Sequence, residues 1–159
     1  MGCGKKVVDA VLFFFLVTLA VITPIFDAES VLPKEVLPKF LVDLKLTYGR
    51  EFGDYLVLEK PAFFVGLTWF DILVVWPLSL LNLFAILASK SWFSKTSLIQ
   101  GVAVFTSMIP ILADMHLSGK ANQNMQMVYY PFLAFSVLAI LRGLLPCTPT
   151  PPPAKKKRV

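Results

Sequence analysis

Four long apolar stretches dominate the pattern of hydrophobic and polar positions along this chain. They cover residues 7–26, 62–88, 98–116 and 127–145. A helix needs about 20 mainly apolar residues to cross a hydrocarbon core of about 30 Å. No polar face recurs at helical spacing within these runs, as it would in a soluble helix bundle. The pattern therefore predicts an all-α, polytopic membrane protein with a four-transmembrane-helix bundle.

Composition and charge agree with a membrane protein. Of 159 residues, 57% are hydrophobic, whereas soluble domains have about 45–50% even when glycine is counted. The net charge of +5 could indicate a nucleic-acid partner, but the basic residues flank the apolar runs. We therefore expect membrane lipids and no nucleic acid as partners. The first apolar run is longer than a usual signal-peptide core and is predicted to stay as a span.

The distribution of basic residues around the spans predicts their orientation, because cytosolic loops are enriched in lysine and arginine. The first loop, residues 27–61, holds five basic and seven acidic residues. The cytosolic side is marked by Lys5, Lys6, Lys90, Lys95, Arg142, Lys155, Lys156, Lys157 and Arg158. This predicts a cytosolic N-terminus (residues 1–6), a membrane domain (7–145) and a cytosolic, proline- and lysine-rich tail (146–159).

The first loop contains a helical pattern of its own. Apolar residues recur along one face between residues 39 and 52. They are Phe40, Leu41, Leu44, Tyr48 and Phe52. We expect a short amphipathic lumenal helix that either covers the bundle or rests on lipid headgroups.

The tail carries a candidate targeting signal. Lys156 and Lys157 stand four and three residues from the C-terminus, which is the dilysine pattern for retrieval to the endoplasmic reticulum. The alternative is a basic flank that only enforces topology. With two cysteines and one histidine, the chain shows no metal-ligand spacing, and we expect neither a metal nor another cofactor.

Asp71 is the strongest candidate for a functional residue, because carboxylates inside a membrane are costly. It lies nine residues into the second span, about 14 Å deep at 1.5 Å per residue. No basic residue in the spans is placed to neutralise it. Asp27, at the lumenal end of the first span, is the expected partner, and two such carboxyls would share one proton. The pair would accept a ligand cation; the alternative is a purely structural hydrogen bond.

Aromatic residues and prolines surround this position. Aromatic faces favour cationic amines, and helix kinks at proline open space for a pocket. The candidate walls are Trp69, Phe70, Trp76, Phe105 and Tyr129, and the prolines are Pro24, Pro77, Pro110 and Pro131.

Several segments together resemble the sigma-2 receptor (transmembrane protein 97) family, part of the EXPERA group that includes the sterol isomerase emopamil-binding protein. They are Phe26-Asp27, Val31-Leu32-Pro33, Glu51-Phe52, Asp54, Pro61-Ala62-Phe63-Phe64, Asp71, Pro77, Ile109-Pro110-Ile111-Leu112 and Tyr129-Tyr130-Pro131. The resemblance implies a four-helix protein of the endoplasmic-reticulum membrane that binds sterols and lipophilic amines.

The resemblance also implies roles for individual residues. Asp27 matches the carboxylate that pairs with a ligand amine, and Asp71 stands where the family has a proton-sharing glutamate. Asp54 resembles an acid that fixes the first loop, while Ser107 and Tyr129 match pocket-wall positions. The sequence departs from the family at two cavity positions, Val75 and Phe132.

The expected function is therefore that of a receptor-like protein in sterol homeostasis or intracellular sterol transport, without catalytic residues. One alternative is a sterol double-bond isomerase of the emopamil-binding type. Another is a membrane adaptor or chaperone for another transporter. A homodimer and a sterol-transport membrane protein stay open as partners.

Overall fold

The computed structural model describes residues 2–32 and 37–145 of the chain. Within these residues every regular element is helical. Four of the described helices are long and apolar enough to span a membrane: Lys5–Val31, Ala62–Leu87, Phe93–Leu117 and Gln123–Leu144. The prediction of an all-α, four-span membrane protein is confirmed. Lys156 and Lys157 lie outside the described residues.

Two of the four spans are subdivided by short π-helical segments. The elements in chain order are α1 (Gly2–Ile22), η1 (Thr23–Asp27), α2 (Ala28–Val31), α3 (Lys39–Phe52), α4 (Tyr55–Glu59), α5 (Ala62–Phe70), η2 (Asp71–Val75), α6 (Trp76–Leu87), α7 (Phe93–Leu117) and α8 (Gln123–Leu144). The first span is thus α1–η1–α2, and the second is α5–η2–α6.

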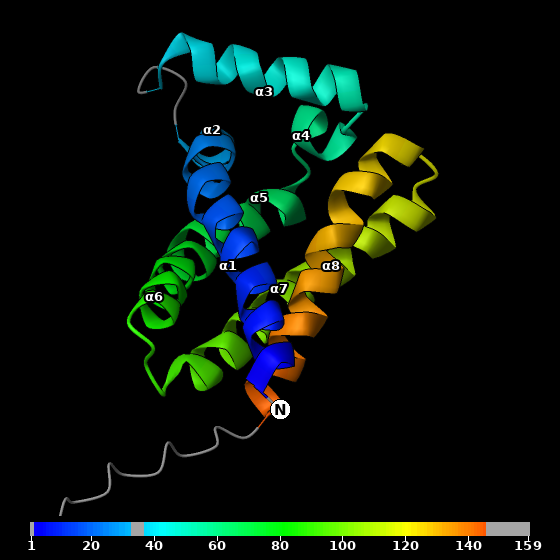
Figure 1. The fold of residues 1–159 in the computed structure, drawn as a ribbon. Coiled ribbons are helices and arrows are strands. Elements are labelled where there is room, and N and C mark those ends of the chain that lie inside the picture. The colour runs from blue at the N-terminus through cyan, green and yellow to red at the C-terminus, as the bar shows by residue number, and fades with distance from the viewer. Residues whose placement is uncertain (1, 33–36, 146–159) are drawn as a thin grey trace, which may run out of the picture.

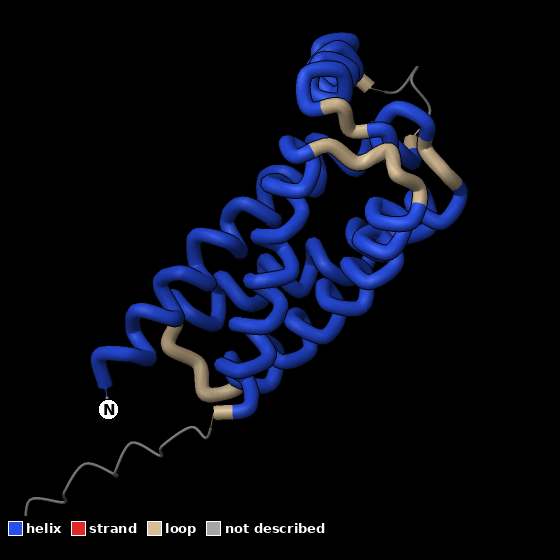
Figure 2. Tube along the Cα trace, turned by 90° about the vertical axis from the view of Figure 1, so that its right-hand side faces the viewer, coloured by secondary structure: helices blue, strands red, loops and turns tan. Residues whose placement is uncertain are grey.

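The spans pack as a ring in which α1 contacts α6 and α8, and α7 contacts α6 and α8 (Figures 1 and 2). Two glycines allow the close approach of α7 and α8. A Cβ on Gly101 would lie 2.7 Å from the Ile140 nitrogen, and one on Gly143 would lie 2.5 Å from Leu98 Cβ. Small residues have this role in membrane helix pairs, where close backbone packing replaces the hydrophobic effect.

Proline accompanies both π-helical segments. Pro24 lies in the first turn of η1, and Pro77 follows η2 at the start of α6. Proline has no N–H and its ring clashes with the carbonyl four residues earlier, so the α-helical ladder is interrupted there. Such π segments are frequent at functional sites. Pro110 and Pro131 lie inside uninterrupted α7 and α8.

Helix α3 lies across the end of the bundle that is opposite the N-terminus (Figure 1). It covers the bundle with Lys45 and Gly49, which are buried. Two apolar residues of its predicted face point elsewhere, since Phe40 is 66% exposed and Leu44 48% exposed, whereas Tyr48 of the same face turns toward the bundle. The predicted apolar face is thus divided between the bundle and the outer surface of the helix, where lipid headgroups can contact Phe40 and Leu44.

Helices α3 and α4 together form a lid that is fixed to the α7–α8 end. Gly53, at a φ of 63°, ends α3 in the left-handed conformation, which glycine adopts without strain. Helix α4, which the sequence pattern did not predict, follows at once. Tyr55 of α4 donates a 2.6 Å hydrogen bond to Asp114 of α7. Asn122, the N-cap of α8, donates a 2.8 Å bond to the Phe52 carbonyl.

Candidate functional site

A cavity lies among the spans beneath the lid. Its volume is about 200 Å³, on a measure in which one water needs about 10–15 Å³. The space therefore suits a ligand much larger than water. Its wall is mainly apolar, and its polar lining consists of Thr23, Asp27, Lys45, Tyr48, Asp54, Thr68, Asp71, Ser107 and Tyr129.

Asp27 and Asp71 face this same cavity from the two π-helical segments. Asp27 ends η1, Asp71 begins η2, and the two segments are in contact. Among the described residues no ion pair includes Asp71. The structure thus brings together the two acids that the sequence singled out, and it turns both toward an internal space.

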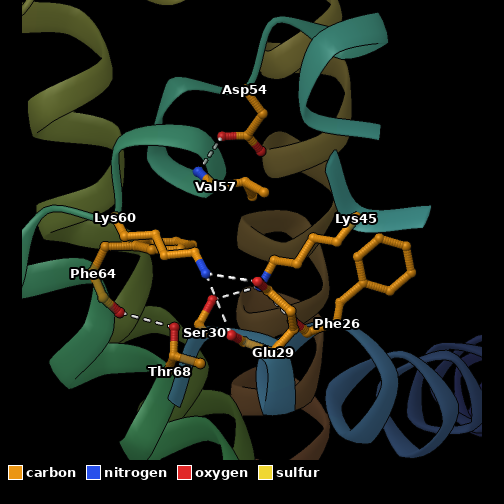
Figure 3. Close-up of polar contacts among 9 residues, drawn as sticks. All are labelled: Phe26, Glu29, Ser30, Lys45, Asp54, Val57, Lys60, Phe64 and Thr68. Carbon is orange, nitrogen blue, oxygen red and sulfur yellow. Dashed lines mark hydrogen bonds and ion pairs between the residues drawn. The ribbon is translucent and has the colours of Figure 1, made fainter. Parts of the chain in front are cut away.

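One cation reaches the cavity from outside the spans, which the sequence analysis did not anticipate. Lys45 of α3 lines the cavity and is only 3% exposed. Its ammonium lies 3.3 Å from Glu29 Oε2 and also donates to the Phe26 carbonyl and the Ser30 hydroxyl (Figure 3). Burial lowers the pKa of Lys45, while the charges of Glu29 and Asp27 act in the opposite direction.

Glu29 joins Lys45 to a second lysine. Its Oε1 lies 2.8 Å from the ammonium of Lys60, and Glu29 is itself buried (Figure 3). Lys60 follows α4 and is not among the cavity-lining residues. Sequence reasoning missed this cluster of Glu29, Lys45 and Lys60. The available signal was Gly49, one helical turn after Lys45, because a glycine on that face allows close approach to the bundle.

Asp54 holds the lid to the rest of the site. Its side chain caps α4 by accepting from the backbone N–H groups of Leu56 at 3.1 Å and Val57 at 3.3 Å. The hydroxyl of Tyr129 donates to it at 3.0 Å, and that of Tyr48 at 3.5 Å. Burial raises the pKa of Asp54, and these hydrogen bonds oppose that effect. Asp54 therefore connects α4, α3 and α8 at the cavity roof.

Ser107 and Tyr129 complete the lining on α7 and α8. Ser107 is 2% exposed, and its Oγ has no hydrogen-bond partner among the described residues. Buried polar atoms are rarely left without partners. This hydroxyl is therefore available to a polar group of a ligand. Tyr129, in contrast, already donates its hydroxyl to Asp54.

Trp76 requires a second correction, because it is not among the residues that line the cavity. Its indole Nε1 instead donates a 3.0 Å hydrogen bond to the Ala20 carbonyl, and it borders a separate apolar groove with Trp69. Of the other proposed aromatic walls only Tyr129 lines the cavity, since Trp69, Phe70 and Phe105 are exposed. The apolar wall is formed by other side chains, Phe26, Phe64 and Phe132 among them.

The described residues contain no group of three potential metal-ligating side chains. The polar groups at the site are three carboxyls (Asp27, Asp54 and Asp71), one ammonium and several hydroxyl groups inside an apolar wall. Such a lining can exchange hydrogen bonds with a hydroxyl group or pair with a cation, while the wall contacts an apolar body.

Fold and cavity together define a polytopic membrane protein with an acidic pocket inside its helix bundle. The chain belongs to the EXPERA (EXPanded EBP superfamily) family, whose model matches residues 40–143.

Curated relatives agree with this membership. The chain is 29% identical over 110 residues to the Sigma intracellular receptor 2 of Macaca fascicularis and to that of Homo sapiens, and this match covers 69% of the chain. It spans 62% of each of those proteins, which is less than two thirds of their length. The protein of the same name from Xenopus tropicalis is 22% identical over 157 residues, covering 91% of this chain and 92% of the relative.

Proposed function

We propose that this protein binds sterols and lipophilic amines in its intramembrane cavity and acts in sterol homeostasis or intracellular sterol transport. The observation that carries the proposal is the meeting of Asp27 and Asp71 at one cavity between the spans. Membrane-embedded acids are costly and mark ligand or ion sites by default. Similarity to proteins named as receptors supports a binding role.

The proposed ligand orientation follows from the lining. An apolar ring system contacts the wall, and its polar end lies between the two acids and the unpartnered Ser107 hydroxyl. A sterol hydroxyl can donate to one carboxyl group and accept from a protonated one or from Ser107. An amine would instead form an ion pair with Asp27. Both ligand classes combine a large apolar body with a single polar end.

The direct test is equilibrium binding of a radiolabelled oxysterol and a radiolabelled lipophilic amine to the purified protein. Asp27→Asn removes a charge from the cavity with little change in shape and is expected to weaken amine binding at least about tenfold. Asp43→Asn is the matched control, because Asp43 is an exposed residue of α3 outside the cavity lining. Unchanged binding of both ligands to Asp27→Asn would remove the proposed anchor.

The isomerase alternative is also testable. It needs an acid to protonate the sterol double bond and a base to accept a neighbouring proton. The single histidine, His116, is exposed and contacts Tyr130 rather than lining the cavity. Binding without turnover is therefore the better-supported proposal. Expression in cells that lack sterol isomerase would decide, since a restored sterol profile would establish catalysis.

We further propose residence in the endoplasmic-reticulum membrane with both termini cytosolic, which places the lid on the lumenal side. The basic flanks of the spans and the dilysine pattern at Lys156 and Lys157 support this. Replacing both lysines by serine should release the protein to later compartments. Persistent residence of that variant would leave the lysines only a topological role. Pull-down from membranes would test a homodimer and an adaptor role toward a sterol-transport protein.

A further inference from the structure

The position of Lys45 in the cavity has a consequence for ligand choice. Its Nζ is close to three oxygen acceptors, on Phe26, Ser30 and Glu29. An ammonium group has three N–H donors, so the protonated side chain can satisfy all of them. These contacts fix a positive charge at the cavity wall, where it also acts on the Asp27 carboxyl.

The charges in direct contact with Lys45 can be counted first. Glu29 accepts from both Lys45 and Lys60, so one of the two lysine charges is in excess of Glu29. Asp27 and Asp71, if they share one proton, carry one negative charge that offsets this excess. Asp54 is a third acid of the lining; its neutral donors, Tyr129, Tyr48 and two backbone N–H groups, stabilise the carboxyl group without cancelling its charge. Whatever the total, a ligand amine that approached Asp27 would meet the ammonium group of Lys45 at the same wall.

We propose that Lys45 determines the ligand class of this cavity, favouring neutral hydroxylated sterols over cationic amines. The proposal rests on the proposed function, because it concerns the same site. A neutral hydroxyl group adds no charge and can bond to Asp27, Asp71 or Ser107. A protonated amine placed at Asp27 is repelled by the ammonium of Lys45 across a cavity wall of low polarity, where screening by water is weak.

The chain offers a matched pair of variants. Lys45→Met removes the charge inside the cavity while Glu29 keeps Lys60 as its partner. Lys60→Met removes a charge from the same cluster but outside the cavity lining, and Glu29 keeps Lys45. Lys45→Gln keeps donors for Phe26 and Ser30 and serves if the methionine variant does not fold.

Dissociation constants for one radiolabelled sterol and one lipophilic amine are measured on each protein. We expect Lys45→Met to bind the amine at least about tenfold more tightly than the wild type does. Its affinity for the sterol should change less than about threefold. Lys60→Met should bind both ligands about as tightly as the wild type. An unchanged amine-to-sterol ratio in Lys45→Met, or an equal shift in both variants, would overturn the proposal. Absence of binding of both ligands to the wild type would instead refute the proposed function itself.

A second measurement needs only the unaltered protein. A neutral sterol and its analogue with an ammonium group in place of the hydroxyl are compared in competition. The neutral compound should bind more tightly; tighter binding of the ammonium analogue would contradict a selecting role for Lys45.

Discussion

The indole of Trp76 donates a 3.0 Å hydrogen bond to the backbone carbonyl of Ala20, which lies four residues before Pro24. That carbonyl would bond to the N–H of residue 24 in a regular α-helix, and proline has none. A side chain of the second span therefore supplies a donor to a carbonyl that the proline cannot bond. The bond joins the two spans next to the segments that carry Asp27 and Asp71.

Trp76→Phe should therefore destabilise the protein by about 1–3 kcal/mol, because it leaves a part-buried carbonyl without its donor. Thermal unfolding in detergent micelles measures the effect. Trp69→Phe is the control, since Trp69 is exposed on the same span. Equal stability of the two variants would show that the bond contributes nothing.

Asp54→Ala should destabilise the lid more strongly than a cap substitution alone. The lost cap of α4 costs about 1 kcal/mol, and the Tyr129 hydroxyl loses its buried acceptor as well. Limited proteolysis within residues 37–61 should become faster, and thermal unfolding should occur at a lower temperature. Asp43→Ala, at an exposed position on α3, should change neither. Wild-type proteolysis of Asp54→Ala would exclude the proposed anchoring role.

Glu29 and Glu59, which both form ion pairs with lysine, should differ in their contribution to stability. Glu29→Gln leaves Lys45 buried without its carboxylate, and breaking a buried pair in this way costs about 3–5 kcal/mol. Glu59→Gln breaks the pair with Lys120, whose side chains are 54% and 50% exposed, and exposed pairs contribute about 0–1 kcal/mol. Chemical unfolding should show a larger loss of stability for Glu29→Gln than for Glu59→Gln. A larger loss for Glu59→Gln would contradict the burial argument.

Replacement by alanine is expected to change the stability of the protein in opposite directions at two glycines of the bundle. Gly101→Ala places a methyl group 2.7 Å from backbone atoms of α8 and should cost about 1–3 kcal/mol by forcing the helices apart. Gly66→Ala meets nothing within 4 Å and should stabilise α5 by up to about 1 kcal/mol, because alanine favours helices. Thermal unfolding of both variants tests the α7–α8 packing. A neutral Gly101→Ala would indicate that this contact is loose.

The spans and the two acids could be predicted from sequence because each depends on a local property. An apolar run of about 20 residues identifies a span, and Asp71 is conspicuous within one. The depth of Asp71 in its span and the place of Asp27 at a span end were enough to suggest that they meet. The π-helical segments around Pro24 and Pro77 were not foreseen in this form, since proline indicates an interruption but not its geometry.

The contribution of α3 could not be predicted, because helical periodicity does not say which face of a membrane-surface helix is buried. Phe40 and Leu44 suggest that the apolar face of α3 packs on the bundle. In the structure these two residues are exposed, where lipid can cover them, and Lys45 is buried against the bundle instead. Partners of Lys45 lie 15 to 19 residues away in the chain, and only the folded arrangement brings Glu29 and Lys60 together. The sequence places Trp76 at the cavity wall, wrongly, because aromatic content indicates a pocket but not which side chains face it.

The most direct test of the binding proposal is identification by mass spectrometry of the lipids that remain with the purified protein. Wild type, Asp27→Asn and Asp43→Asn are isolated from the same membranes under the same detergent conditions. We predict that a sterol is enriched with the wild type and with Asp43→Asn relative to bulk membrane lipid, and that it is strongly depleted with Asp27→Asn. Equal sterol content in all three preparations, or no enrichment over the membrane, would contradict a ligand site at Asp27 and Asp71.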